Sequence, residues 1–93
     1  MKIDAAAITM DNAGTLVEAG LAAIARGDTV VDLSAVRSVD SSAVALLLAF
    51  YRAARAQGKT LALHGVPDAL VSLARLYGVE SLLALDGLPA PTR

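Results

Sequence analysis

The fold of this chain is decided by one stretch, Val39-Asp40-Ser41-Ser42-Ala43-Val44-Ala45-Leu46-Leu47-Leu48-Ala49-Phe50-Tyr51-Arg52. The apolar, β-branched run Thr29-Val30-Val31-Asp32-Leu33 precedes it, and a helical pattern continues from it to Gly58. The polar triplet Asp40-Ser41-Ser42 stands between the two. This order predicts a strand, a turn and a helix whose first turn presents free backbone N–H groups.

Length and composition limit the chain to one small domain. Its 93 residues leave no room for a second core, and with 56% apolar but only 3% aromatic residues the core must be aliphatic. A net charge of -1 excludes the basic surface typical of nucleic-acid or anionic-membrane binding. The absence of Cys and the presence of one His exclude disulfides and disfavour metal sites and cysteine or triad chemistry.

The N-terminus indicates a cytoplasmic protein. Met1-Lys2-Ile3-Asp4 lacks the pattern of a signal peptide. No apolar run approaches the roughly 20 residues that a membrane helix needs. The high apolar content favours a surface that a partner covers.

The first half of the chain predicts, in order, a strand at Ala5–Met10, a turn at Asp11–Gly14, a helix from Thr15 to Gly27 and a strand at Thr29–Leu33. Thr15 and Glu18 have the spacing of a capping box, which predicts the start of the helix. The strand at Thr29–Leu33 is almost continuously apolar, as is typical of a strand covered on both faces.

The second half begins with a predicted short connection at Ser34–Val39 and a helix at Ser42–Gln57, which is capped by Asp40 or Ser41. A strand at Thr60–Val66, a helix that starts at Pro67 and a short last strand at Val79–Leu85 are predicted to follow. Helical spacing predicts two inward-facing sets: Val44, Leu46, Leu47, Phe50 and Tyr51 in the first of these helices, and Leu70, Leu73, Ala74 and Tyr77 in the second.

Strands and helices therefore alternate as β-α-β-α-β-α-β. This order predicts an α/β sandwich of about four strands and three helices, with a mainly parallel sheet and one thinly covered face. We expect the domain to span residues 1–86 and residues 87–93 to form a flexible tail.

The Asp40-Ser41-Ser42 turn allows three interpretations. It can be a simple helix cap, which contributes about 1 kcal/mol. It can present an exposed hydroxyl to which phosphate is added, close to free N–H groups. A serine nucleophile is the third interpretation, and it fails because the one possible base, His64, lies on another strand and no G-x-S-x-G motif is present.

The side of the second helix opposite its apolar residues carries an alanine strip, made of Ala45, Ala49, Ala53 and Ala56 with Arg52 among them. Alanine is a good helix former on any surface. The strip can equally be a docking site, because small side chains let another backbone approach and one arginine can pair with a carboxylate. The sequence leaves both interpretations open.

The chain resembles the STAS domain family in four segments: Val30–Ser34, Val39–Ser42, Val44–Leu48 and Gly58–Leu61. The family includes anti-anti-sigma factors, tails of sulfate transporters, and a small subunit of the Mla phospholipid-transport ABC complex. The segment from His64 to Val79 is most similar to that MlaB-like subunit. The resemblance implies a small sandwich with a mixed sheet. The sequence itself offers no nucleophile–base pair, metal set or Gly-rich phosphate loop, so we expect no cofactor and no catalytic activity.

The resemblance also implies roles for particular residues. The regulatory residue of the family corresponds to Ser41, which an anti-sigma factor kinase phosphorylates in the sigma-regulating branch. In the transporter branch the same turn and the following helix contact the ATPase subunit. The partner-binding residues are then Asp40, Ser41 and Ser42, with Ala45, Ala49 and Arg52 on the matching helix face.

Two departures from the family pattern bear on the choice of branch. Ala43 stands where the family usually has Gly, which removes room for close approach there. The short segment before the first helix favours the transporter branch. We therefore expect a non-catalytic subunit that binds the ATPase of an ABC phospholipid transporter involved in lipid asymmetry, cytoplasmic or peripheral at the inner membrane through its partner. The alternative is an anti-sigma factor antagonist regulated at Ser41.

Overall fold

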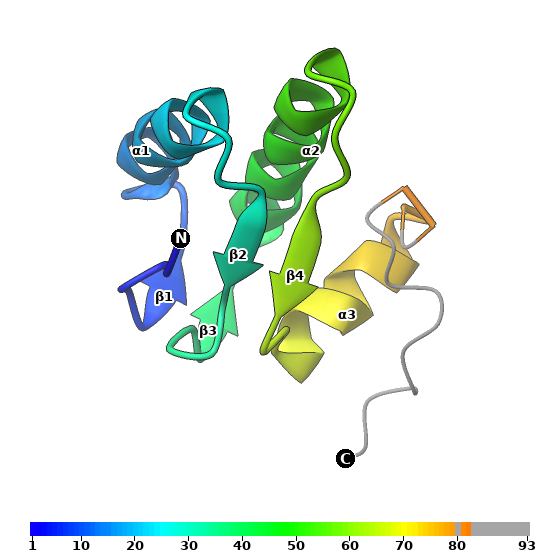
Figure 1. The fold of residues 1–93 in the computed structure, drawn as a ribbon. Helices are drawn as coiled ribbons and strands as arrows, with labels where there is room; N and C mark the ends of the chain where they lie inside the picture. The colour runs from blue at the N-terminus through cyan, green and yellow to red at the C-terminus, as the bar shows by residue number, and fades with distance from the viewer. Residues whose placement is uncertain (80, 83–93) are drawn as a thin grey trace.

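The structure, a computed structural model, describes residues 1–79 and 81–82. Strands and helices alternate along most of these residues (Figure 1), in the order β1 (Ala7–Ile8), α1 (Ala13–Ala25), β2 (Val30–Asp32), β3 (Ser38–Val39), α2 (Ser41–Ala56), β4 (Ala62–His64) and α3 (Asp68–Leu76). The α/β class and the three helices of the described residues agree with the sequence analysis.

The strands form two parallel ladders, not the one mixed sheet that the family resemblance implied. Strand β1 pairs with β3, and β2 pairs with β4. The segment before β1 also joins β2, because the Ile3 N–H donates to the Asp32 carbonyl at 2.9 Å. Each ladder joins strands with a helix between them in sequence, and a crossover of that kind returns the chain in the parallel direction.

Strand β3 lies inside the segment that the sequence analysis treated as a connection. The Ser38 N–H donates to the Ala6 carbonyl at 3.2 Å, and the Asp40 N–H donates to the Ile8 carbonyl at 3.1 Å. A strand of two residues is too short to show an alternating pattern in the sequence. Strand β3 is therefore recognised only by its hydrogen bonds with the segment of β1.

The last predicted strand, Val79–Leu85, lies mostly outside the described residues. Among its described members, Val79 is not in a strand and residues 81–82 form a turn. The expected domain boundary at residue 86 and the tail at 87–93 also lie outside the described residues.

Helix α1 begins at Ala13, two residues before the predicted capping box. Asn12 closes the preceding turn: its Oδ1 accepts from the Thr9 N–H at 2.9 Å, and its Nδ2 donates to the Ala7 carbonyl at 2.8 Å. The Ala13 N–H donates to the Thr9 carbonyl at 2.9 Å, so the first turn is already formed before Thr15. The predicted capping box is therefore wrong, and Thr15 lies exposed on the helix.

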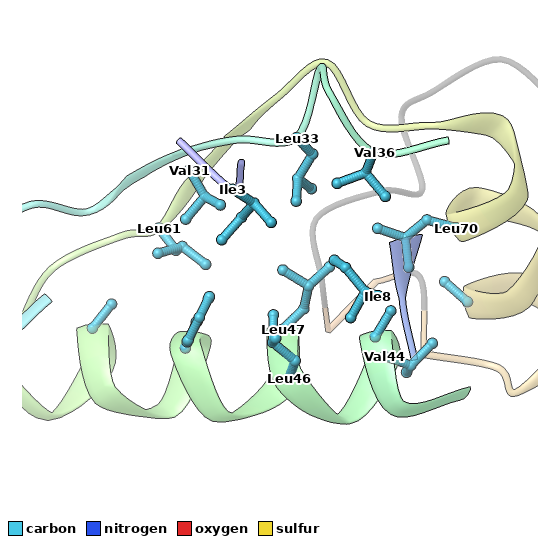
Figure 2. Close-up of a cluster of buried hydrophobic side chains, with 14 of the residues drawn as sticks. Ile3, Ile8, Val31, Leu33, Val36, Val44, Leu46, Leu47, Leu61 and Leu70 are labelled. Carbon is cyan, nitrogen blue, oxygen red and sulfur yellow. The ribbon is translucent and has the colours of Figure 1, made fainter. Parts of the chain in front are cut away.

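The core lies between the strands and α2. In Figure 2 the side chains of Val31 and Leu33 point from the strand region toward Leu47 of α2, and all three are fully buried. The predicted inner face of α2 is confirmed by its buried residues Val44, Leu46, Leu47 and Phe50, with Tyr51 half-buried at its edge.

Two predictions of burial are wrong. Val30 is 45% exposed although the neighbouring Val31 is buried, so β2 is covered on one face there, as a thinly covered sandwich implies. Tyr77 is 52% exposed because α3 ends at Leu76, one residue before it, while Leu70 and Ala74 of the same predicted face are buried.

Helices α1 and α2 pack against each other through a glycine. Gly20 of α1 is buried, and a Cβ atom placed there would lie 2.1 Å from Cζ of Phe50. The Phe50 ring is itself fully buried, and side chains in a packed core have little room to move. The close approach of the two helices therefore requires a residue without a side chain at position 20.

We expect Gly20→Val to lower the free energy of unfolding by about 2 kcal/mol or more, because the added methyl groups overpack the contact with Phe50. Urea unfolding of the purified domain measures this change. Gly14→Val is the matched control, since nothing lies within 4 Å of a Cβ at that position of the same helix. Equal losses in the two variants would contradict the contact.

Candidate protein-binding face at the start of helix α2

Asp40 is the N-cap of α2, which decides between the two caps that the sequence allowed. Its backbone is extended, with φ −116° and ψ −171°, and its Oδ1 accepts from the Ser42 N–H at 2.8 Å. The Ser42 hydroxyl donates to the same oxygen. The first bond satisfies one of the free N–H groups of the helix, and the second uses the side chain of Ser42 internally.

The second carboxylate oxygen of Asp40 reaches the β1 side of the molecule. Oδ2 accepts from the Met10 N–H at 3.2 Å. One side chain therefore holds the residues after β1 and the first turn of α2 at a fixed distance. Met10 itself is 82% exposed beside this turn, and the sequence analysis did not single it out. The β1–β3 ladder and the hydrogen bond to Asp40, across 30 residues, bring Met10 to the site.

Hydrogen bonds hold the pKa of Asp40 below its ordinary value of 3.8. The Ser42 hydroxyl has the largest effect, followed by the Ser42 N–H, and the Met10 N–H contributes a lesser part against the opposing effect of desolvation. Asp40 is therefore a charged, structural group at neutral pH.

Ser41 differs from Ser42 in its surroundings. It is the first residue of α2 and is exposed, whereas Ser42 is half-buried. Within the described residues the Ser41 hydroxyl has no hydrogen-bond partner, and the Ser42 hydroxyl is bound to Asp40. Of the two serines, Ser41 is thus the one available to a partner or a modifying enzyme.

The exposed side of α2 continues from Ser41 along the helix. Ala45 and Arg52 are exposed and Ala49 is half-buried. At 100° per residue the four side chains fall within one quarter of the helix circumference. We call Ser41, Ala45, Ala49 and Arg52 the outer face of α2. Of the other predicted strip residues, Ala56 is exposed and Ala53 packs against the core.

Ala43 lies on the opposite side of the helix from Ser41 and is fully buried. Its methyl group packs in the hydrophobic core. The sequence analysis expected Ala43, in place of the usual Gly, to hinder a close approach at this turn. That expectation is wrong for a partner, because the side chain points into the core and leaves the outer face unchanged.

A shallow hollow of about 220 Å³ adjoins the outer face. It is lined by Leu48, Tyr51, Arg52, Arg55 and Leu82. Leu48 and Arg55 are seven residues apart, a spacing that places both on one face of a helix. The sequence contained this signal, but the two residues were not predicted to share a site. Leu82 follows α3 in the chain, and no sequence signal predicts that it lies beside α2.

The structure gives no support to the other chemistry considered. The Ser42 hydroxyl is bound to Asp40, and His64 lies opposite Asp32 in the register of β2 and β4. In the described ranges, 1–79 and 81–82, no three potential metal ligands come together. Within the same residues no helix has the length and hydropathy needed to span a membrane.

We expect the Asp40 cap to make stability depend on pH. Because the pKa of Asp40 is lowered on folding, its contribution is present above the ordinary value of 3.8 and is lost as the pH falls through the lower folded value. Urea unfolding between pH 6 and pH 2 should therefore show a smaller loss of stability for Asp40→Asn than for the unchanged chain. Asp4→Asn, at an exposed position, is the control, and an equal change in both variants would contradict the assignment.

Comparison with known proteins shows the family of this chain. A family model described as "Mlab, STAS domain" matches residues 5–85. The intermembrane phospholipid transport system binding proteins MlaB of Escherichia coli (strain K12) and Shigella flexneri are each 43% identical to the chain over 56 residues. That match covers 60% of this chain and 58% of each relative. Since the family model spans most of the sequence, the chain belongs to the MlaB-type STAS domain family.

Proposed function

We propose that this chain is a non-catalytic subunit that binds the ATPase of an ABC phospholipid transporter through the outer face of α2. The observation that carries the proposal is the division of α2. One side is buried in the core, while the other is exposed from Ser41 to Arg52 and consists mainly of small side chains. A helix with this division is firmly held by the domain and still offers a surface for contact.

The outer face has the properties of a docking surface. Alanine side chains lose no rotamer freedom when a partner covers them, so ordering this face on binding costs little entropy. Small side chains also let a partner backbone approach the helix closely. Arg52 provides one charged group that can pair with a carboxylate of the partner.

The names of the relatives suggest the setting in which this face acts. Both are binding proteins of an intermembrane phospholipid transport system. An ABC transporter contains an ATPase subunit on the cytoplasmic side, and a small domain can dock there. We propose that the chain supports assembly of such a transporter and thereby lipid asymmetry, and that it is cytoplasmic and reaches the inner membrane through its partner.

The exposed hydroxyl of Ser41 favours a second candidate function. In an anti-sigma factor antagonist a kinase would phosphorylate this residue and so release the partner. A phosphate on Ser41 would lie beside the N–H groups of the first turn of α2, and its charge would stand at the edge of the outer face. This alternative shares the binding surface and differs in the partner.

We expect Ala45→Glu to weaken binding of the purified ATPase subunit about tenfold or more, because a charged side chain would have to be desolvated on the outer face. Biolayer interferometry with the ATPase from the same genome measures the affinity. Ala22→Glu, on the exposed side of α1, is the matched control. The proposal fails if the unchanged chain does not bind the ATPase and instead binds a sigma-factor kinase.

We expect Ser41→Glu to weaken binding of the same partner more than Ser42→Ala does. A carboxylate in the first turn of a helix favours folding, so the loss would come from charge at the contact. Ser42→Ala removes a hydrogen bond to Asp40 and should instead lower thermal stability. The melting temperature of each variant, measured by circular dichroism beside the affinity, separates the two effects. Unchanged affinity for every partner in Ser41→Glu would remove Ser41 from the contact.

A further inference from the structure

The hollow beside the outer face of α2 combines apolar and cationic groups. Leu48 and Tyr51 are half-buried and Leu82 is 61% exposed, so these three side chains provide its apolar lining. Arg52 and Arg55 are exposed and one helical turn apart. A surface of this kind matches a ligand that is apolar at one point and negatively charged beside it.

The charge of the two arginines is unbalanced locally. Neither has an ion-pair partner in the part of the chain that the structure describes. Helix α2 contains no acidic residue from Ser41 to Ala56, although the whole chain has a net charge of -1. Arg55 lies in the last turn, where a cation interacts favourably with the helix dipole, but Arg52 lies a turn earlier and has no such role. The hollow is therefore complementary to an anionic group.

The size of the hollow limits what can enter it. Its volume of about 220 Å³ is below the roughly 300–1,000 Å³ of small-molecule pockets. One bulky side chain fits such a space, whereas the two acyl chains of a phospholipid do not. Tyrosine and arginine are also among the residue types enriched at the positions that dominate protein–protein binding energy. Volume and composition both favour a protein segment as the occupant.

We propose that this hollow anchors a segment of the partner ATPase in which one bulky apolar side chain enters between Leu48 and Leu82 and a neighbouring carboxylate pairs with Arg52 or Arg55. This inference rests on the proposed function, since it names the part of the partner that α2 would hold. The hollow shares Arg52 with the outer face, so one segment can cover both. The contact places the partner along the whole exposed length of α2, beyond the turn at Ser41.

The test compares charge reversals at exposed positions. The purified ATPase subunit is the probe, and its affinity for the full chain is measured at low and high salt. We expect Arg52→Glu with Arg55→Glu to weaken binding about tenfold or more and to reduce its salt dependence. Arg37→Glu, at an exposed position before β3, is the matched single-charge control and should leave binding within about twofold of the original.

Two further variants guard against an effect on folding. Arg52→Gln with Arg55→Gln removes the charges without introducing acids into α2. Leu82→Asp places a negative charge at the edge of the hollow, outside the helices. We expect both to weaken ATPase binding while the melting temperature stays unchanged. Full affinity in these folded variants would overturn the inference.

The outcomes separate this inference from the proposed function. If Ala45→Glu prevents ATPase binding while the arginine and Leu82 variants bind normally, the outer face is used and the hollow is not. If the unchanged chain does not bind the ATPase, both proposals fail. Vesicles of phosphatidylglycerol are the remaining probe. If the chain binds these vesicles and the binding requires both arginines, the hollow binds a lipid surface, and the proposal of a protein segment is wrong.

Discussion

The carboxylate of Asp40 is the contact on which the arrangement of this domain depends. One oxygen accepts from the Ser42 N–H at the start of α2, and the other accepts from the Met10 N–H after β1. The Asp40 N–H meanwhile donates to the Ile8 carbonyl and so extends the β1–β3 ladder. The residue therefore ends a strand, starts a helix and joins the first segment of the chain to both.

The apolar spacing of α2 sets which of its sides faces outward, and this contact fixes where the helix begins. With the first turn of the helix held at Asp40, Ala43 and Phe50 lie in the core and Ser41 and Ala45 lie outside. The buried side of the helix makes the exposed side rigid, because the packed core resists rotation of α2. A preorganised surface loses less entropy on association. One side of α2 thus packs in the core, and its other side forms the proposed binding surface.

Much of the fold and site could be predicted from the sequence because the relevant signals are local. The apolar spacing in α2, the polar break at Asp40 and the alternation of strands and helices depend on residues close together in the chain. The predicted capping box at Thr15 was wrong because Asn12 accepts a hydrogen bond from the Thr9 N–H and donates one to the Ala7 carbonyl, which closes the turn earlier. The mixed sheet came from family resemblance, and the described strands all pair in parallel.

The sequence by itself determined the α/β class, the helix that follows Asp40-Ser41-Ser42 and the side of that helix that enters the core, because hydrophobic periodicity expresses these properties directly. Only the tertiary structure decided that the Ser42 hydroxyl is bound to Asp40 while the Ser41 hydroxyl has no partner among the described residues, that Met10 lies beside them, and that Leu82 completes a hollow with Arg52. The placement of Met10 beside Asp40 and of Leu82 beside Arg52 joins residues about 30 positions apart in the chain, and such contacts depend on how the elements pack.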